Sequence, residues 1–403
     1  MLTLEKFQEA SKKVKEVTND TKLMYSQFFS DVTGNEVYLK PENLQKTGAY
    51  KLRGAYYKIS TLTDEERSKG LIAASAGNHA QGVAFAARQY GVKAVIVMPV
   101  TTPLIKVNRT KALGAEVVLY GNIYDEACNY AYELAEKHGY TFIHPFDDEV
   151  VATGQGSIMM EIYDELKDVD YVLVPIGGGG LATGISGAAK LLNPNIKVIG
   201  IEPEGAASLK AACDAGKVVS LDKVKTIADG TAVRTIGSVT FPYLKENLDS
   251  IITIPDEELV TAFIDVVENH KMVAENSGLL AVAALHHLDC KGKKVVAIVS
   301  GGNMDVSTMA TEVEHGLIMR GRLCSVQVVL SDNAGELAKL TGLISEHKGN
   351  VVNIEHVHHL ATGIADSVRV IVTLRCFGME HKNEIIDALK NAQYKIEETD
   401  VRL

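Results

Sequence analysis

A run of four glycines, residues 177–180, is the part of the chain whose residue types point most directly to a chemical role. It follows the apolar, β-branched run 171–176, which is typical of a buried strand, and it precedes residues 181–192, which predict a helix. Glycines leave backbone N–H groups bare enough to contact a ligand. A strand, a turn with bare amides and a helix N-terminus together predict an anion site, most often for a phosphate.

Three kinds of phosphate ligand suit such a turn, and the neighbouring residues separate them. A mononucleotide P-loop ends in Gly-Lys-Ser/Thr, whereas Leu181 follows Gly180, so a P-loop is excluded. The G-x-G-x-x-A pattern that starts at Gly177 suits a dinucleotide, and the predicted strand 197–201 leads into Glu202, where a ribose-binding acid would lie. A pyridoxal phosphate site needs in addition a lysine elsewhere in the chain that forms a Schiff base.

Such a lysine lies in the segment 42–55, which reads ENLQKTGAYKLRGA. Here the chain resembles the pyridoxal-phosphate-dependent lyases of the threonine/serine dehydratase family, which have fold type II. The resemblance continues at residues 75–82 (SAGNHAQG), at the four glycines and at residues 300–303 (SGGN). It covers residues 1–320 with four motifs in the same order, which is more specific than any of the motifs alone.

The resemblance implies that Lys51 forms the Schiff base with the cofactor and removes the proton from the substrate's Cα. A lysine in this role has to be neutral for part of the cycle, which requires an enclosed, partly apolar site. The neighbours Tyr50 and Leu52 fit such a site, and Tyr50 would supply an aromatic wall. Taken alone, the segment would also suit a surface lysine in a basic loop with Lys46 and Arg53.

The resemblance also implies contacts to the rest of the cofactor. The Asn78 side chain would meet the ring oxygen, and the Ser300 hydroxyl, at the end of the predicted strand 294–299, would lie against the pyridine nitrogen. A serine there leaves that nitrogen largely unprotonated, which suits β-elimination better than transamination. The phosphate would be held by the backbone of Gly177, Gly178, Gly179, Gly180 and Leu181.

The substrate is expected to bind at residues 75–79, between the predicted strand 71–74 and a predicted helix, because a helix N-terminus suits a carboxylate. By the resemblance, the residues that grip the substrate are Ser75, Ala76, Gly77, Asn78 and His79. Racemases of the family carry a serine as a second base where this chain has Ala76. Alanine cannot transfer a proton, so elimination with little racemisation is expected.

The activity that the resemblance implies is an L-threonine ammonia-lyase reaction, which gives 2-oxobutanoate and ammonia, and which would also convert L-serine to pyruvate. Serine racemase and β-replacement enzymes use the same cofactor, but Ala76 disfavours the first and residues 48–53 fit the second poorly. Outside this class, an NAD-dependent oxidoreductase and a non-catalytic amino-acid sensor stay open. A role in isoleucine biosynthesis and a role in threonine catabolism are both open as well.

No metal site is predicted. Some relatives bind a divalent cation with a glutamate, a carbonyl and an aspartate in the segment matching residues 202–208, but here Ser208 stands at the aspartate position beside Glu202. Three histidines, His356, His358 and His359, lie close together in sequence. Alternation along a strand separates His359 from the other two, which favours an exposed or interface strand over a metal site.

The elements that must position these residues alternate between strand and helix from about residue 56 to residue 299. Short β-branched runs at 71–74, 94–98, 116–120, 171–176, 198–201 and 294–299 are separated by helical stretches that end at glycines. This alternation predicts an α/β fold with mostly parallel sheet, in two sheets, one before about residue 140 and one after. A catalytic region 1–320 is expected, with a small domain of about residues 49–145 inserted in a large one.

Residues 321–403 have a different pattern. Strands are predicted at 325–330, 351–357, 367–375 and from about 395, with helices at 335–347 and 382–392. This β-α-β-β-α-β order predicts a ferredoxin-like module, and it resembles an ACT domain, a regulatory fold that binds small ligands. The expected effector residues are Asp332, Asn333, Gly335, Leu337 and Asn353, although Asn333-Ala334 replaces the commoner Arg-Pro of such modules.

Composition excludes several other classes. The chain has 403 residues, is 46% hydrophobic and 23% charged, and has a net charge of −10, so nucleic acid is not an expected partner. No apolar run reaches transmembrane length, and the charged N-terminal helix pattern is not expected to be a signal peptide. The five scattered cysteines suit reduced thiols of a cytoplasmic protein. A homotetramer is the family expectation.

Overall fold

The computed structural model describes residues 1–357 and 367–401. The chain divides into two compact units, Met1–Met304 and Asp305–Leu403. Each unit is described by itself below. The domain boundaries expected from the sequence stay a prediction.

The first unit contains a large, mostly parallel sheet with the strand order β1-β2-β10-β7-β8-β9. Of the described strands in this sheet, only the short β1 is antiparallel to its neighbour, β2. The register aligns Val299 with Pro41, so the carboxyl ends of β10 and β2 lie together. The strands are β1 (Met24–Tyr25), β2 (Glu36–Pro41), β7 (Tyr171–Pro175), β8 (Lys197–Pro203), β9 (Ser250–Ile254) and β10 (Lys294–Val299).

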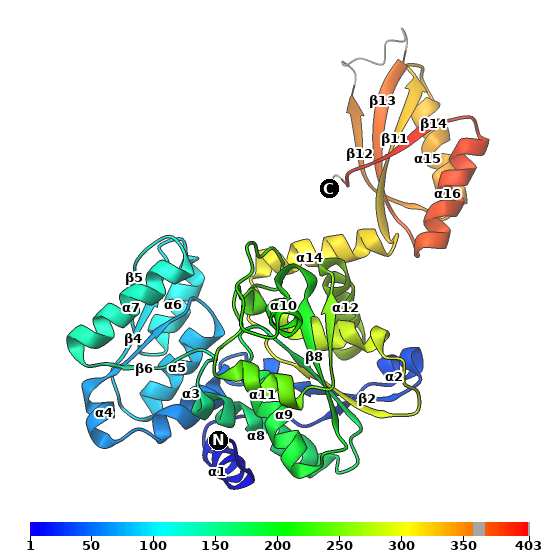
Figure 1. The fold of residues 1–403 in the computed structure, drawn as a ribbon. Helices are drawn as coiled ribbons and strands as arrows, with labels where there is room; N and C mark the ends of the chain where they lie inside the picture. Colours follow the sequence, from blue (N-terminus) through cyan, green and yellow to red (C-terminus); the bar gives the residue numbers. More distant parts are fainter. Residues whose placement is uncertain (358–366, 402–403) are drawn as a thin grey trace. The chain divides into compact units, whose positions relative to one another are not determined.

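A smaller parallel sheet in the same unit has the order β5-β4-β3-β6. Its strands are β3 (Leu71–Ala74), β4 (Ala94–Met98), β5 (Glu116–Leu119) and β6 (Thr141–Phe142). Figure 1 shows this sheet and its helices, mostly in cyan, as a lobe beside the large sheet, whose strands range from blue (β2) through green (β8) to yellow.

Helices cover both sheets. Those of the first unit are α1 (Leu4–Val14), α2 (Gln27–Thr33), α3 (Lys51–Ser60), α4 (Asp64–Lys69), α5 (Asn78–Gln89), α6 (Leu104–Ala112), α7 (Tyr124–His138), α8 (Glu149–Glu165), α9 (Gly180–Leu192), α10 (Ser208–Ala215), α11 (Thr240–Asn247), α12 (Asp256–His270) and α13 (Asn276–Ala283). Short 3₁₀ turns are η1 (Glu42–Leu44), η2 (Glu204–Ala206), η3 (Asp229–Thr231) and η4 (Ala284–His287).

The burial pattern explains why the central strands are apolar on both faces. On the large sheet, Val172, Val174 and Ile298 point into a core that α8 and α9 share, while α13 lies against β7 and β10. On the small sheet, alternate residues pack against α3 and α5 on one face and against α7 on the other. Strands buried on both faces need continuous apolar runs.

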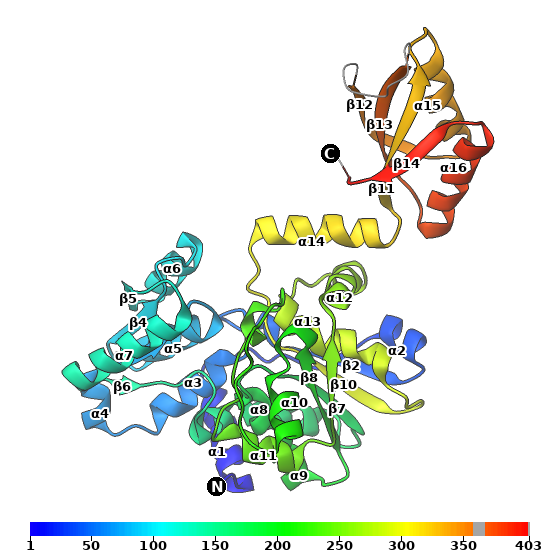
Figure 2. The same cartoon turned by 45° about the horizontal axis from the view of Figure 1, so that its top comes forward.

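The second unit is a ferredoxin-like module preceded by a helix, as Figure 2 shows in yellow to red. Its elements are α14 (Val306–Met319), β11 (Leu323–Ser331), α15 (Glu336–Glu346), β12 (Asn350–Val357), β13 (Ser367–Arg375), α16 (Met379–Asn391) and β14 (Lys395–Thr399). The sheet order is β12-β13-β11-β14, all antiparallel. Leu340 and Ile344 of α15 and Ile385 and Leu389 of α16 fill the core beneath it.

The predicted fold class is confirmed, but one part of the sheet assignment is wrong. β1 and β2 precede residue 140 and yet belong to the large sheet, and β6 follows residue 140 and belongs to the small one. The reason is that β2 pairs with β10, from the far end of the unit. Pairing between segments so distant in sequence leaves no local pattern.

Candidate active site

The glycine turn lies at the carboxyl end of β7. Gly179 is the N-cap of α9 with φ 95° and ψ −11°, a left-handed conformation that favours glycine. Among the described residues, none accepts a hydrogen bond from the backbone N–H groups of residues 177–181. A helix N-terminus with unpaired amides is suited to an anion.

Neighbouring side chains close around this turn so tightly that only glycine fits. A Cβ atom on Gly178 would lie 2.2 Å from the ring of Phe146, and one on Gly177 would lie 3.0 Å from Cα of Thr231. The turn is therefore walled in by its neighbours, and any residue larger than glycine would displace them.

Lys51 is the first residue of α3 and is half-buried. Its Nζ donates a hydrogen bond of 2.7 Å to the carbonyl oxygen of Pro145, the residue just before Phe146. Burial lowers the pKa of Lys51 to about 8, partly opposed by the charge of Glu275. The neutral amine, which a nucleophile or base requires, is therefore far more populated near neutral pH than in an exposed lysine.

The loop 144–148 connects Lys51 to the glycine turn, since Pro145 contacts the lysine and Phe146 covers Gly178. Asp147 holds this loop in place by accepting hydrogen bonds from the N–H groups at the start of α11, including those of Val239 at 2.8 Å and Thr240 at 3.2 Å. Thus the lysine and the turn, far apart in sequence, are brought to one site.

Asn78, the first residue of α5, lies in a chain of hydrogen bonds. Its Nδ2 donates to Oε1 of Glu275 at 2.5 Å, and its Oδ1 accepts from Nδ2 of Asn303 at 2.8 Å. Asn303 also donates to the carbonyl oxygen of Thr47 at 2.7 Å. These partners fix which side of the Asn78 amide carries the NH₂ group and leave it one N–H for a ligand.

Ser300 is buried and follows β10. Its hydroxyl donates weakly to the carbonyl oxygen of Ser277 at 3.5 Å, and its carbonyl accepts from the N–H of Tyr50 at 3.1 Å. The Tyr50 ring centroid lies 5.4 Å from Nζ of Lys51, and burial raises the pKa of the Tyr50 phenol, with a further rise from Glu275. Ser300, Tyr50 and Lys51 are thus adjacent.

The predicted substrate segment turns at the start of α5. Ser75, Ala76 and Gly77 are half-buried, and the Ser75 hydroxyl accepts a hydrogen bond of 3.2 Å from the N–H of Gly77. The His79 ring is buried and bonds through Nε2 to the carbonyl of Ile143 at 2.8 Å. Because a carbonyl only accepts, Nε2 carries the proton, and burial lowers the pKa of His79 to about 3. Its side chain is therefore neutral, and its second ring nitrogen, Nδ1, is buried without a hydrogen-bond partner among the described residues.

Glu275 was not predicted from the sequence, although it contacts Asn78. Burial raises the pKa of Glu275 to about 7. The signal that could have found it is an acid within the otherwise apolar stretch around residues 272–285. A charged residue in such surroundings is paired or functional more often than not.

Glu202 caps a helix in this structure. Its two carboxylate oxygens accept hydrogen bonds from the N–H groups of Leu209 at 2.7 Å and Lys210 at 2.9 Å, at the start of α10. Within residues 1–357 and 367–401, no group of three or more acidic, histidine or cysteine side chains is placed to bind a metal. His356 is exposed on β12, whereas His358 and His359 lie outside the described residues.

In the second unit, the predicted effector residues lie around the start of α15. Asp332 and Asn333 are exposed, Gly335 is the N-cap with φ 94°, and Leu337 and Asn353 are half-buried.

No helix in the part of the chain that the structure describes is long and apolar enough to span a bilayer.

Comparison with known proteins places these features in context. Residues 14–301 match the profile of a family described as pyridoxal-phosphate dependent enzyme. The chain is 43% identical to a protein of Thermotoga maritima named L-threonine ammonia-lyase, over 98% of this chain and 99% of the relative. Among solved structures, processed threonine deaminase isoform 2 of Solanum lycopersicum has a TM-score of 0.75 and 42% identity, covering 77% of this chain and 93% of that one. Maize serine racemase has a TM-score of 0.74 and 32% identity, covering 78% and 98%.

Proposed function

The chain belongs to the family of pyridoxal-phosphate-dependent enzymes, and we propose that it is an L-threonine ammonia-lyase that converts L-threonine into 2-oxobutanoate and ammonia. L-Serine is the proposed second substrate, with pyruvate as product. The observation that carries the proposal is the meeting of Lys51, whose pKa is lowered to about 8, with a walled turn of unpaired amides.

The residues of the site fit this cofactor. The unpaired amides of residues 177–181 suit its phosphate, and the glycine backbone leaves room where a Cβ would collide with Phe146. The remaining N–H of Asn78 suits the ring oxygen, and the Ser300 hydroxyl suits the pyridine nitrogen. When bound, pyridoxal phosphate delocalises the electron pair that is left on the substrate's Cα after loss of its proton.

Lys51 is the residue proposed to bind the cofactor and to move the Cα proton. Its lowered pKa makes the neutral amine accessible, so Nζ would be able to accept the proton from the substrate's Cα. The carbonyl of Pro145, 2.7 Å from Nζ, provides a resting partner that holds the amine between the two roles. The half-buried position limits access of water to the same atom.

Substrate binding is proposed at the start of α5. The backbone N–H groups of residues 75–79 and the Ser75 hydroxyl would bind the carboxylate at the positive end of the helix. The amide orientation of Asn78, fixed by Glu275 and Asn303, keeps the donor that faces the cofactor in a constant place. His79 would contribute its backbone, because its ring is buried against Ile143.

The experiment that tests this function compares Lys51→Ala with Lys46→Ala, an exposed lysine in the same segment. We expect Lys51→Ala to abolish both the yellow absorbance of the cofactor–lysine adduct and formation of 2-oxobutanoate from threonine, while Lys46→Ala keeps both. Retained turnover in Lys51→Ala would refute the assignment. Absence of keto acid from the yellow wild-type protein would refute the reaction.

For the second unit we propose a regulatory role as an ACT-like domain. The βαββαβ order supports this, and the effector would bind at Asp332, Asn333, Gly335, Leu337 and Asn353. An amino-acid end product is the proposed ligand class. Threonine saturation curves with and without isoleucine, repeated for Asn333→Ala, provide the test: we expect a shift of the curve that the variant reduces. Superimposable wild-type curves would argue against isoleucine.

A cytoplasmic homotetramer is the proposed state of the enzyme. The free thiols of Cys128, Cys213, Cys290, Cys324 and Cys376 support a reducing compartment. Sedimentation of the purified protein measures the assembly directly.

A further inference from the structure

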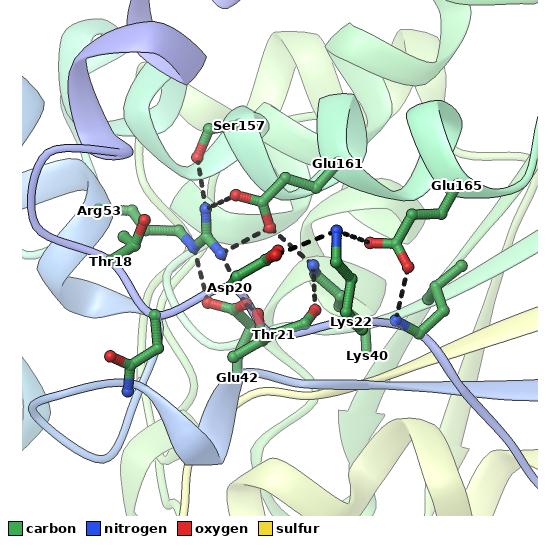
Figure 3. A network of polar contacts seen from close by, with 12 residues as sticks. Thr18, Asp20, Thr21, Lys22, Lys40, Glu42, Arg53, Ser157, Glu161 and Glu165 are labelled. Carbon is green, nitrogen blue, oxygen red and sulfur yellow. Dashed lines mark hydrogen bonds and ion pairs between the residues drawn. The ribbon is translucent and has the colours of Figure 1, made fainter.

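Two residues after Lys51, Arg53 joins a group of four charged side chains, Lys40, Glu42, Arg53 and Glu161, which we term the buried quartet (Figure 3). The side chains of Lys40, Glu42 and Arg53 are 0% exposed and that of Glu161 is 11% exposed. Two cations and two anions balance one another. The sequence assigned Arg53 no role in the site and named it only in the alternative of a basic surface loop, so its complete burial calls for an explanation.

Every N–H group of the Arg53 guanidinium has an acceptor. Nε and Nη2 donate to the two oxygens of Glu42 at 2.7 and 2.8 Å, and Nη1 and Nη2 donate to the two oxygens of Glu161 at 2.6 and 2.8 Å. The second N–H of Nη1 donates to Oγ of Ser157 at 3.1 Å. Two bidentate pairs and a fifth bond fix both the position and the plane of the guanidinium.

The other members tie this arrangement to the large sheet. Nζ of Lys40, on β2, donates to Glu161 at 2.6 Å and to the carbonyl of Thr21 at 2.6 Å. Glu42 also accepts from the Thr21 hydroxyl at 2.7 Å. Burial would lower the pKa of Arg53, but the carboxylates of Glu42 and Glu161 raise it, so the guanidinium stays charged.

The quartet joins four segments at one point: β2, η1, α3 and α8. Arg53 is in the first turn of α3, two residues after Lys51. Since successive helical residues are separated by about 100° around the axis, two residues apart means nearly opposite faces. Arg53 therefore holds the first turn of α3 from the face opposite to the cofactor site.

Backbone contacts prevent that turn from shifting along or across its neighbours. A Cβ on Gly82 of α5 would lie 3.1 Å from the backbone of Lys51, and one on Gly154 of α8 would lie 2.7 Å from Cα of Gly54. The turn that carries Lys51 is thus packed directly against two helices, while the quartet sets its distance from β2. In the proposed function the Lys51 side chain changes its bonding partner during each turnover, so it would not anchor the turn.

We propose that Arg53 is a positioning residue for Lys51, and that the buried quartet sets the place from which the lysine amine reaches the cofactor and the substrate's Cα. The proposal rests on the proposed function, in which Lys51 carries that chemistry. A buried ionic cluster is not needed for stability as such, because apolar side chains of similar volume often stabilise a core equally well. The ionic cluster instead restricts orientation, because the five hydrogen bonds of the Arg53 guanidinium favour one orientation of the first turn of α3.

The decisive variant is Arg53→Lys, which keeps the charge balance of the quartet but replaces a rigid five-donor fork by a three-donor ammonium. The control is Ser60→Ala at the end of the same helix, which removes the 2.6 Å hydrogen bond from the Ser60 hydroxyl to the carbonyl oxygen of Tyr57 without touching the quartet. Three properties are measured in each full-length holoenzyme: kcat and KM for threonine, the pH titration of the cofactor absorbance, and the thermal unfolding midpoint. Borohydride reduction followed by peptide mass spectrometry reports the fraction of cofactor attached to Lys51.

We expect Arg53→Lys to lower kcat on the order of tenfold to hundredfold with little change in KM, because a small misplacement of a catalytic group has effects of that size. The pH at which the cofactor absorbance changes should also shift, and the fraction attached to Lys51 should fall. Ser60→Ala should alter only the unfolding midpoint. Wild-type kcat and titration in a folded Arg53→Lys protein would overturn the proposal, since charge alone would then suffice.

If Arg53→Lys is not recovered folded, Ser157→Ala decides, because it removes one of the five bonds and leaves every charge in place. A smaller fall in kcat and a shift in the same titration are expected, and a variant identical to wild type overturns the proposal. Failure of the function itself is separate: it would be seen as an unmodified Lys51 peptide in the reduced wild-type enzyme.

Discussion

Two turns of this chain have almost the same backbone and very different surroundings. Gly179 caps α9 with φ 95° and ψ −11°, and Gly335 caps α15 with φ 94° and ψ −13°; each follows a strand. A Cβ on Gly179 would lie 2.7 Å from Oγ1 of Thr240, whereas one on Gly335 would meet nothing within 4 Å. A strand, a left-handed glycine and a helix thus make the same local unit in a walled site and on an open surface.

This difference shows that the turn itself supplies only backbone hydrogen-bond donors. In the first unit, residues distant in sequence, such as Phe146, form the wall around the turn. Burial in this site lowers the pKa of Lys51 and raises the pKa of Glu275. In the second unit Asp332 and Asn333 beside the turn are exposed. A ligand held at the open turn must therefore be bound more weakly, unless another surface covers it.

The largest effect is expected from the matched pair Gly179→Ala and Gly335→Ala. Both add the strain of a left-handed alanine, about 1–2 kcal/mol. Only Gly179→Ala also pushes Thr240 and shifts the amides, so its affinity for pyridoxal phosphate should fall by on the order of tenfold or more. Cofactor titration by absorbance and unfolding midpoints for both variants provide the measurement.

Equal cofactor affinity in the two variants would contradict this contrast between the turns, because the wall around the first turn would then contribute nothing to binding. A loss of stability in both variants, larger in Gly179→Ala because of the added contact with Thr240, together with a loss of cofactor affinity in Gly179→Ala alone, would confirm it.

A second, intermediate effect concerns Glu275 and pH. Its pKa in the folded protein is raised to about 7 by burial, so folding takes up a proton between its ordinary pKa and about 7. The stability that this group contributes is present in its protonated form and declines as pH rises through that window, by at most about 1.4 kcal/mol per unit. Glu275→Gln should remove this decline.

The measurement is urea unfolding of wild type and Glu275→Gln from about pH 5 to about pH 8, the range that spans the titration. The variant should gain stability relative to wild type as the pH rises. If the stabilities of the two proteins changed with pH in parallel, the walled site would not raise the pKa of the Glu275 carboxyl. The contrast with the open turn would then be weaker.

The smallest effect is expected from Ala76→Ser, which adds a hydroxyl to the half-buried substrate segment. Chiral chromatography of the products from L-serine should detect D-serine in the variant, at a rate well below that of pyruvate formation, because a second proton donor would face the substrate. Racemisation in wild type at a rate near that of elimination would contradict the role of Ala76.

Much of the fold could be predicted because its strands are locally marked. β3, β4, β10 and β13 have the predicted bounds, since each is a continuous or alternating β-branched run. β2 was missed because it contains charged residues, and Lys40 becomes acceptable in a buried strand only through Glu161, far along the chain. Local pattern cannot show a charge that is neutralised by a distant partner.

The site follows the same rule. The glycine turn and Lys51 could be proposed because motifs surround them, and the structure brings them together through Pro145 and Phe146. The roles of these residues stay a prediction. Glu275 was missed because its partner Asn78 is distant in sequence, and the ring of His79 was assigned no orientation until its carbonyl partner was known.

The pairing of β2 with β10 has a consequence for biosynthesis. β2 is made early and β10 is the last strand of its unit, and β10 lies between β2 and β7 in the sheet. The small sheet can therefore form while the chain is still being translated, whereas β2 and β7 must wait with unpaired edges until residue 299 has left the ribosome. During that interval the nascent chain exposes two strand edges with unpaired backbone N–H and C=O groups, so it is at this stage of synthesis that a chaperone would be needed.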